Sequence, residues 1–529
     1  MSPVDAVVIG SGPNGLVAAN LLADAGWQVR VLEAQPTLGG SVASDRELRP
    51  DFIHDTFSAF YPLAAASKTI ESLHLEDHGL QWRRAPAVLG TPRHDQPWAL
   101  VCDEPTATAA GLDRDAAGDG QVWLDLVEQW EKVREPLLAA LLTPFPPIRA
   151  GVRLGVRLPS VGGMSFVRML LQPVLGMVQQ RFSGDAARLL LLGNAGHADI
   201  PVTGMGSGVF GWLMTMLAQT YGFPSPAGGA GVLTEAMAAR LRSLGGEIIC
   251  NAAVSEVVLK NGRAVGVRTR GGETIFATRA VLADVAAPSL YGELIPAKFL
   301  PARVRRGISE FNWDPGTVKV DFALNGPIPW AVAPDANPGT VHILDSLEDM
   351  STWTAQLSSG FVPDNPYLLL GQMTTTDASR SPVGTESAWA YTHVPQRVRG
   401  DAGGAGLTGS WDDAEREHFG DRVQNRIEEY APGFGSRILE RRVLGPRELQ
   451  RRNQNLVGGA INGGTAEPHQ QLIFRPVPGL GRSETPFKAL YLASAATHPG
   501  GGVHGSCGAN AARAALAHDR ISFPTLRRG

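Results

Sequence analysis

Three glycines near the start of the sequence, Gly10, Gly12 and Gly15, have the spacing of a turn that binds a diphosphate. They follow the apolar run 7–9, which is typical of a buried parallel strand. Gly10 permits a tight turn, Gly12 lets a diphosphate approach the backbone, and Gly15 lets the following helix pack closely on the strand. The helix N-terminus would then face the phosphates. The predicted contacts include the intervening residues Ser11, Pro13 and Asn14.

The spacing alone is weak evidence, because 62 glycines in 529 residues give about 0.8 such matches by chance. The order of the neighbouring elements is stronger evidence. Good helix formers occupy residues 16–25, and Gly26 stands where a left-handed residue would end that helix. A second strand is predicted over 28–32 and leads to Glu33, whose carboxylate can accept hydrogen bonds from ribose hydroxyls, with Ala34 beside it. An unrelated glycine-rich turn would leave this order unexplained, so we expect an adenosine diphosphate moiety.

Two distant segments have the pattern of further parts of the same α/β unit. The first begins at Pro226-Ala-Gly-Gly-Ala-Gly-Val-Leu and predicts a helix over 234–244. Strands are expected over 248–249, 254–259 and 264–269, with an Asn261-Gly262 hairpin turn, and over 280–283 in the main sheet. The second segment, 492–516, reads as an apolar strand, a glycine-rich turn and a helix of small residues.

The diglycine Gly39-Gly40 and the His498-Pro-Gly segment resemble the flavoprotein group that includes amine oxidases and phytoene desaturases. This resemblance implies FAD as the cofactor. It implies that the diglycine lies near the second phosphate and the ribityl chain, and that the backbone of Val254 meets adenine. It also places Gly502, Val503 and Gly505 near the flavin ring. The sequence departs from the group at Ser41, where an arginine often stands, and at Ser494, where glycine is common; both are kept as predicted cofactor contacts.

The resemblance is narrower to phytoene-desaturase-related oxidoreductases, through Phe52-Ile-His-Asp-Thr-Phe-Ser-Ala-Phe, Trp389-Ala-Tyr-Thr-His-Val-Pro and Gly458-Gly-Ala-Ile-Asn-Gly-Gly. It implies an α/β fold with a discontinuous Rossmann-like FAD-binding domain of the glutathione-reductase/amine-oxidase type. We expect that domain to comprise 1–75, 225–290 and 481–529. A mixed α+β substrate domain would comprise 76–224 and 291–480, with a helical lid around 120–222.

Composition excludes several other classes. A hydrophobic fraction of 43% and a charged fraction of 19% are typical of a globular protein, and a formal net charge of -4 gives no sign of a nucleic-acid partner. The three cysteines form no Cys-x-x-Cys pair, the twelve histidines show no metal-ligand spacing, and no Gly-x-Ser-x-Gly elbow follows a strand. The histidine spacing gives no reason to expect a metal site. The start of the sequence has no basic segment followed by an apolar one, so we expect a cytoplasmic protein.

The segment from Pro136 to Gly184 contains arginines but no acidic residue. Arg149, Arg153 and Arg157 would share one face of a helix. One interpretation is a basic amphipathic region on the inner, anionic membrane surface that admits a lipid-soluble substrate. The other is a solvated helix face over a domain core, which Gly151, Gly155 and Pro159 favour because they weaken long helices.

The leading functional hypothesis is an FAD-dependent dehydrogenase, desaturase or oxidase that transfers hydride from an apolar, isoprenoid or lipid-like substrate to flavin N5. Oxygen or a quinone would be the external electron acceptor, because no second dinucleotide motif or redox dithiol is present. The alternatives are an amine oxidase, a redox-neutral isomerase that uses reduced FAD, and a non-catalytic flavin-bound scaffold protein. Candidates for proton handling are His504, which is preferred, and His54, Asp55, Tyr391, His393 and His498.

Overall fold

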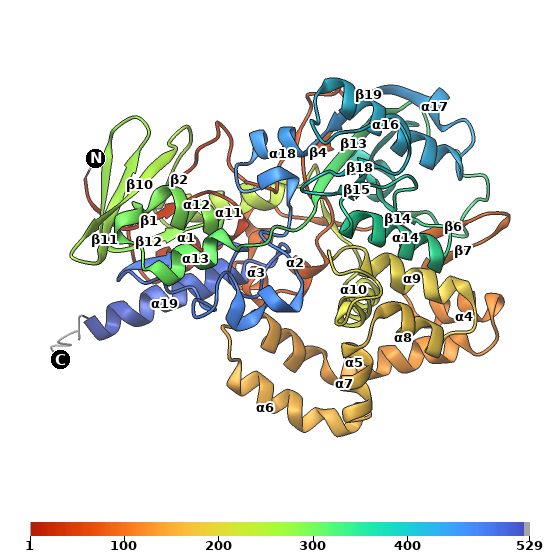
Figure 1. The fold of residues 1–529 in the computed structure, drawn as a ribbon, viewed down its shortest axis with the longest axis horizontal. Helices are drawn as coiled ribbons and strands as arrows, with labels where there is room; N and C mark the ends of the chain where they lie inside the picture. Colours follow the sequence, from red (N-terminus) through yellow and green to blue (C-terminus); the bar gives the residue numbers. More distant parts are fainter. Residues whose placement is uncertain (1, 523–529) are drawn as a thin grey trace.

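The computed structural model describes residues 2–522, and two large sheets lie on opposite sides of the view in Figure 1. The first sheet has the order β10-β11-β12-β1-β2-β9, and β20 also pairs with β12. Strands β9, β2, β1, β12 and β20 are parallel neighbours, whereas β10 and β11 form an antiparallel hairpin on β12. Their bounds are β1 Val4–Ile9, β2 Val29–Leu32, β9 Glu247–Ile249, β10 Val254–Lys260, β11 Arg263–Thr269, β12 Thr274–Ala283 and β20 Leu490–Leu492.

Alternation along β1 sends side chains into two separate cores. Ala6 and Val8 pack with the helices on one face, while Val7 and Ile9 pack on the other face with the hairpin and α13. The helices of the first face are α1 Pro13–Asp24, α11 Gly231–Ser243 and α19 Ser506–Ser522. The other face is covered by α12 Ala287–Ser289 and α13 Ala302–Ser309. The parallel centre is therefore buried on both faces, as expected for an α/β sheet.

The second sheet has the order β19-β13-β17-β16-β14-β6-β7. Neighbouring strands in this sheet are antiparallel, except that β14 and β6 are parallel. The bounds are β6 Ala87–Arg93, β7 Gln96–Val101, β13 Gly316–Leu324, β14 Pro338–Ile343, β16 Leu368–Gln372, β17 Glu386–Val394 and β19 Ile438–Leu444. One face packs against α16 Asp413–Glu428 and α17 Phe434–Arg437; we call the opposite face, which carries Trp389 and Tyr391, the inner face.

A group of helices covers the inner face and extends below it in Figure 1. They are α4 Pro105–Asp115, α5 Asp119–Leu142, α6 Ile148–Arg157, α7 Met164–Leu171, α8 Val174–Arg181, α9 Asp185–Ala195, α10 Ser207–Tyr221 and α14 Leu347–Ser358. Trp123, Trp130 and Trp212 anchor this layer and are fully buried. Across residues 2–522, no helix combines the length and apolar character needed to cross a bilayer.

Shorter strands and helices complete the fold. They are β3 Ser44–Asp45, β4 His54–Asp55, β5 Trp82–Arg83, β8 Ser225–Pro226, β15 Phe361–Val362, β18 Gly400–Asp401, α2 Pro62–Ala66, α3 Lys68–Glu71, α15 Met373–Thr376 and α18 Pro446–Arg452.

The predicted fold class is confirmed, and most element predictions agree within a few residues. The first helix ends at Asp24 and Gly26 has φ of 81°, the left-handed conformation expected of it. Asn261 and Gly262 have φ of 50° and 72°, as the predicted hairpin turn requires. The helix predicted over 16–25 begins earlier, because Pro13 occupies its first position and fixes a helical φ there.

Candidate functional site

The glycine turn joins β1 to α1 and lies against the end of β12. Gly10 has φ of 94°, which few other residues adopt. A Cβ atom on Gly15 would lie 2.3 Å from the carbonyl oxygen of Gly10, and one on Gly12 would lie 2.7 Å from Oδ2 of Asp284. Side chains are thus excluded from the turn, and the positive end of α1 faces it. This arrangement suits an anionic diphosphate.

Asp284 directly follows β12 and is a site residue that the sequence analysis missed. Its Oδ2 accepts a hydrogen bond from the backbone N–H of Gly15 at 2.8 Å. Burial of the side chain raises its pKa to about 7. An acidic residue directly after the apolar run 280–283 was the signal that could have revealed it, because that strand was expected beside β1.

Glu33 lies at the end of β2, where the ribose site was predicted. Its Oε2 accepts hydrogen bonds from the backbone N–H and the hydroxyl of Ser11, at 2.9 and 2.6 Å, and its Oε1 accepts from the N–H of Gln35. The carbonyl of Glu33 also accepts from Ala252, just before β10. Ser11, Glu33 and Val254, the first residue of β10, therefore lie in one region, as an adenosine site requires, while Ala34 is exposed at its edge.

The predicted diglycine lies against the first glycine turn. A Cβ atom on Gly40 would lie only 3.0 Å from Cα of Gly12, and Gly39 donates to the backbone oxygen of Ser11 at 3.2 Å. The hydroxyl of Ser41, at the position where related sequences often have arginine, accepts a hydrogen bond from Asn453 at 2.7 Å. Asn453 is the C-cap residue of α18, and the sequence did not predict that it would lie at the diglycine.

The C-terminal segment brings a second helix N-terminus to the same place. Helix α19 packs beside α1, and a Cβ atom on Gly508 would lie 1.9 Å from the backbone oxygen of Asn14. The preceding turn has φ of 104° at Gly502 and 68° at Gly505, with Val503 half-buried between them. Ser494 is buried and its hydroxyl accepts from the N–H of Ala496. Two adjoining helix N-termini and a turn without side chains fit a cofactor that carries negative charge at its diphosphate and, when reduced, at its ring.

Three of the four main catalytic candidates are histidines with lowered pKa values. Burial is the first cause for each, and it lowers the pKa of His54 and of His504 to about 4. Burial also lowers the pKa of His393. His504 accepts a hydrogen bond on Nδ1 from the N–H of Ser506, and its carbonyl accepts from Ser67. Neutral imidazoles of this kind can accept or donate a hydrogen bond but carry no charge at neutral pH.

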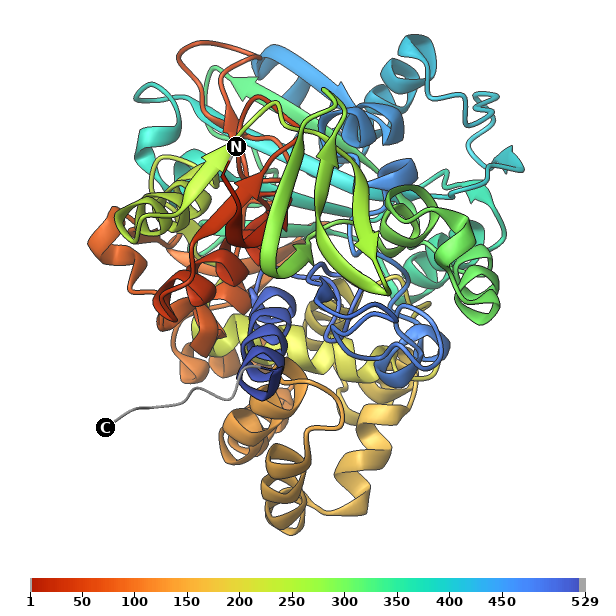
Figure 2. The same ribbon diagram turned by 90° about the vertical axis from the view of Figure 1, so that its left-hand side faces the viewer.

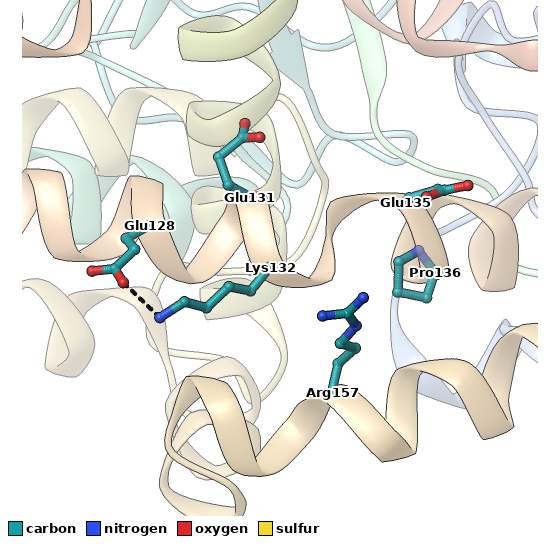
Figure 3. A pocket seen from close by; sticks show the side chains of 6 residues that line it. All are labelled: Glu128, Glu131, Lys132, Glu135, Pro136 and Arg157. Atoms are coloured by element: carbon teal, nitrogen blue, oxygen red, sulfur yellow. Dashed lines mark hydrogen bonds and ion pairs between the residues drawn. The ribbon is translucent and has the colours of Figure 1, made fainter.

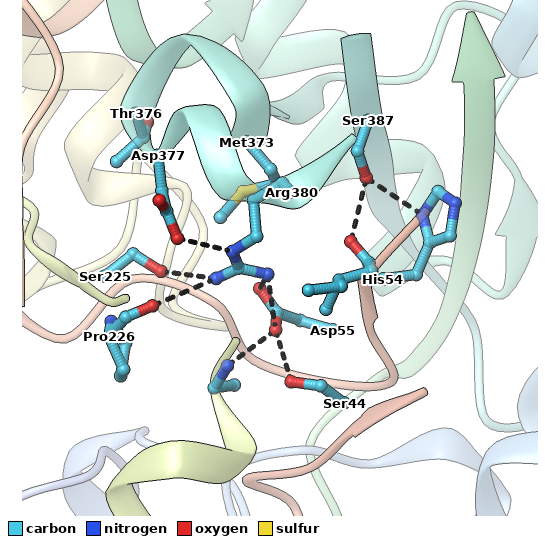
Figure 4. A network of polar contacts seen from close by, with 12 residues as sticks. Ser44, His54, Asp55, Ser225, Pro226, Met373, Thr376, Asp377, Arg380 and Ser387 are labelled. Atoms are coloured by element: carbon cyan, nitrogen blue, oxygen red, sulfur yellow. Dashed lines mark hydrogen bonds and ion pairs between the residues drawn. The ribbon is translucent and has the colours of Figure 1, made fainter. Parts of the chain in front are cut away.

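The second sheet brings His54, Tyr391 and His393 to its inner face but does not cluster all three. His54 of β4 stacks on Phe52. Its Nδ1 atom lies 3.3 Å from the hydroxyl of Ser387 on β17 (Figure 4). Tyr391 lies four residues further along β17, about 13 Å at the strand spacing. The rings of Tyr391 and His393 are 5.8 Å apart. Tyr391 is half-buried, whereas both histidines are buried, and burial raises the pKa of its hydroxyl.

Asp55 and His498, the remaining candidates, have structural contacts. Asp55 pairs with Arg380 at 2.9 Å and accepts from Ser44 and the N–H of Ala230 (Figure 4). His498 lies 6.1 Å from the ring of Phe145, and burial lowers its pKa. Among residues 2–522 no group of His, Cys, Asp or Glu is placed to hold a metal ion.

Two further polar groups on the inner face escaped the sequence analysis. His197, just after α9, and His342 of β14 face each other with their Nε2 atoms 3.0 Å apart. Burial lowers the pKa of His197 to about 3 and that of His342 well below its usual value, so both rings are neutral. Lys319 of β13 is buried, contacts Asp321 and lies 5.8 Å from the ring of Trp389. No local motif marks these residues, because strand and helix pairing alone brings them together.

Comparison with protein families gives two matches. Residues 8–73 match the NAD(P)-binding Rossmann-like domain family, and residues 125–386 match the flavin containing amine oxidoreductase family. A similar curated protein is pyridine nucleotide-disulfide oxidoreductase domain-containing protein 2 of Mus musculus, which is 29% identical over 96% of this chain and 92% of its own. The lycopene-forming phytoene desaturase of Pseudescherichia vulneris is 27% identical over 58% of each chain.

Solved structures share the fold at lower identity. Wild-type putrescine oxidase bound to putrescine superposes with a TM-score of 0.61 and 17% identity, over 98% of this chain and 99% of its own. The glycine turn, the diglycine, the glycine-rich turn at 502–505 and the family and relative matches point the same way. They support the amine oxidase/phytoene desaturase superfamily of FAD-dependent flavoproteins for this chain.

Proposed function

We propose that this FAD-dependent oxidoreductase introduces unsaturation into an apolar substrate of the isoprenoid or lipid-like kind. The observation that carries the proposal is the aromatic inner face of the second sheet. Trp389 and Tyr391 stack at 5.9 Å, Phe60 lies 6.0 Å from Trp389, and both Phe60 and Tyr391 are half-buried. Such a wall binds an apolar molecule by excluding water. The resemblance to phytoene desaturases supports the same substrate class.

We propose that the FAD-binding domain comprises 1–75, 225–290 and 481–529. The substrate domain would comprise 76–224 and 291–480, with the helical lid around 120–222. The glycine turn and the N-termini of α1 and α19 would hold the diphosphate, and the 502–505 turn would hold the ring. Bound FAD supplies hydride acceptance at N5.

The residues of the chain would orient the substrate and exclude water. Tyr391 is the candidate that we propose contacts the substrate, because it alone of the four main candidates is not fully enclosed. His504, His54 and His393 would position the surrounding segments, since each is buried and hydrogen-bonded to a neighbouring group. Oxygen or a quinone would remove the electrons.

Oxidation of an amine is the second candidate, favoured only by the likeness to amine oxidases. A protonated amine requires a free carboxylate or an aromatic cage. Asp199, whose charge acts on His393, already accepts from the Thr465 hydroxyl and the Ala466 N–H at 2.6 and 2.7 Å. The carboxylate of Asp321 is likewise paired with Lys319 and Arg442. The inner face therefore suits an uncharged molecule better.

Anaerobic titration of the purified holoprotein tests this function. Isoprenoid hydrocarbons, lipid-like alkenes and primary amines would be added separately while the flavin absorbance is recorded. Bleaching by the apolar compounds, with a desaturated product, is expected. Bleaching by amines alone would establish an amine oxidase, and product formed by chemically pre-reduced holoprotein, without a change in its flavin spectrum, would establish an isomerase. An unchanged spectrum without product, for every compound, would point to the flavin-bound scaffold.

Tyr391→Phe is the informative variant, with Tyr367→Phe as its matched control. Tyr367 directly precedes β16, the strand that pairs with β17. It is buried, and its hydroxyl donates a hydrogen bond to the carbonyl of Gly193. We expect Tyr391→Phe to change KM or the bleaching rate for a given substrate, while Tyr367→Phe changes stability alone. Equal kinetics in both variants would remove Tyr391 from the site.

A further inference from the structure

Helix α6 is a surface helix without a single buried residue. It spans Ile148–Arg157 and lies at the far end of the helical layer, away from both sheets (Figures 1 and 2). A ten-residue helix is marginal in water unless packing supports it. Because α6 buries no residue, we expect a binding partner to stabilise its outer side.

The outer side of α6 is apolar. Ile148, Val152 and Val156 recur every fourth residue and are 71%, 64% and 74% exposed. Leu154 and Leu158 point the other way and pack on the helical core. Met164 and Leu171 of α7 add two more exposed apolar side chains, at 76% and 54%. Exposed apolar side chains that share one face of a helix, as those of α6 do, mark an interaction surface.

A row of arginines borders this apolar stripe. Arg149, Arg153 and Arg157 are exposed, again at every fourth residue, and Arg168 follows in α7. Within residues 2–522 none of the four has an acidic side chain within ion-pair distance. The nearest stretch of sequence offers none, since 136–184 contains no Asp or Glu. Among the described residues, Arg149, Arg153 and Arg168 are thus without an ionic partner, whereas Arg157 faces the glutamates of α5 across a pocket.

The acidic residues of the neighbouring helix lie on the side of α6 opposite to the apolar stripe. An open pocket between α5 and α6 is lined by Glu128, Glu131, Lys132, Glu135, Pro136 and Arg157 (Figure 3). Lys132 pairs with Glu128 at 2.6 Å, and Arg134 pairs with Glu131 at 3.2 Å. Two of the three glutamates that line this pocket are therefore paired with cations of α5 itself.

We propose that α6 is a docking helix that lies flat on an anionic phospholipid bilayer, with its valine and isoleucine side chains among the acyl chains and with Arg149 and Arg153 at the phosphates. An apolar stripe beside a row of unpaired arginines is the pattern of such interfacial helices. A second copy of the chain fits less well, because an antiparallel symmetric contact through α6 would bring the two arginine rows together. This inference does not depend on the proposed reaction.

The position of α6 has a consequence for access to the site. The segment that leads from α5 into α6 carries Phe145, whose ring contacts that of His498 in the predicted flavin segment. A docked α6 would thus place the bilayer next to the loop that touches the cofactor region. A lipid-dissolved substrate could then enter without crossing water.

Vesicle co-sedimentation of the FAD-loaded protein tests the proposal. The vesicles would contain phosphatidylcholine alone or phosphatidylcholine mixed with phosphatidylglycerol. We expect binding to the anionic vesicles only, weakened by added salt. Arg149→Gln with Arg153→Gln should weaken it about 25-fold, at about fivefold for each arginine. Val152→Ser with Val156→Ser should weaken it about tenfold or more.

Matched controls remove the same groups elsewhere. Arg447 and Arg451 are exposed on α18, at the same four-residue spacing and at the opposite end of the molecule in Figure 1. Changing both to Gln should leave vesicle binding unaltered. Val383 and Leu439 are 104% and 45% exposed, and changing both to Ser is the apolar control. Flavin absorbance and circular dichroism would verify that each variant is folded.

Several outcomes would overturn the proposal. Failure of the wild-type protein to bind anionic vesicles is one, and equal losses in the α6 variants and the controls are another. Size-exclusion chromatography with light scattering tests the alternative that α6 contacts a second copy of the chain. If Val152→Ser with Val156→Ser turned a dimer into a monomer but left vesicle binding unchanged, α6 would be a subunit interface. Flavin bleaching is measured separately, so failure here is distinguishable from failure of the proposed reaction.

Discussion

Asp284 places a carboxyl group beside the proposed diphosphate, so its protonation should control cofactor affinity. The carboxyl has a pKa of about 7, raised first by burial, so below that pH it is neutral and adds no charge beside the phosphates. FAD affinity should therefore fall as pH rises through about 7. Asp284→Asn keeps an acceptor for the N–H of Gly15 and should bind FAD with little pH dependence in this range.

Fluorescence titration of apoprotein with FAD at several pH values measures this effect. The raised pKa also predicts that the free energy of unfolding falls between the unfolded pKa near 3.8 and the folded pKa near 7, because only the unfolded state ionises freely there. Asp284→Asn should remove that fall. If FAD affinity and unfolding free energy depended on pH in the same way in wild type and variant, Asp284 would be ionised throughout this range and would lie away from the phosphates.

The paired histidines on the inner face should make the protein sensitive to acid. Burial holds His197 and His342 neutral, whereas the unfolded chain protonates them near pH 6.5. Stability is therefore present above about pH 6.5 and is lost as pH falls, by about 1.4 kcal/mol per pH unit for each ring. His197→Gln should reduce that slope by about this amount in urea unfolding from about pH 7 to about pH 4. His418→Gln, at an exposed position, is the control, and equal slopes would contradict the prediction.

At the level of elements, the close contact of α1 with α19 should be required for cofactor retention. A Cβ atom on Gly508 would overlap the backbone oxygen of Asn14, so Gly508→Ala must move one helix. We expect a loss of about 1–3 kcal/mol in stability and a lower FAD content. Gly176→Ala in α8 is the control, because nothing lies within 4 Å of its added Cβ; it should be neutral or stabilising by up to about 1 kcal/mol. Full FAD occupancy in Gly508→Ala would contradict this role of the contact.

The elements also show what could be predicted from the sequence. Gly26, the Asn261-Gly262 turn and the glycine turn were predictable, because local backbone conformation dictates their residue types. The strand 280–283 could be placed beside β1 from its apolar run. Asp284, Asn453 and the His197–His342 pair could not, because each acquires its role from a partner more than a hundred residues away. The outer face of α6 was visible as a pattern, but its exposure required the structure.

At the scale of the whole molecule, one buried ion pair ties the first sheet's connections to the second sheet. Asp55 of β4 and Arg380, which follows α15, are both fully buried and 2.9 Å apart (Figure 4). Arg380 also donates to Ser225 and contacts Asp377, while Asp55 accepts from the N–H of Ala230 just before α11. The pair thus joins segments of both proposed domains around one guanidinium.

Removing one partner should loosen the two proposed domains from each other. Arg380→Leu leaves Asp55 charged and buried, which costs about 3–5 kcal/mol. Because the pair joins both domains, we expect urea unfolding to separate into two transitions, with release of FAD in the first. Arg114→Leu removes an arginine from an exposed pair with Asp335 and should cost less than about 1 kcal/mol. A single transition at the wild-type midpoint for Arg380→Leu would show that the two sheets are held together by apolar packing and that this ion pair contributes little to their union.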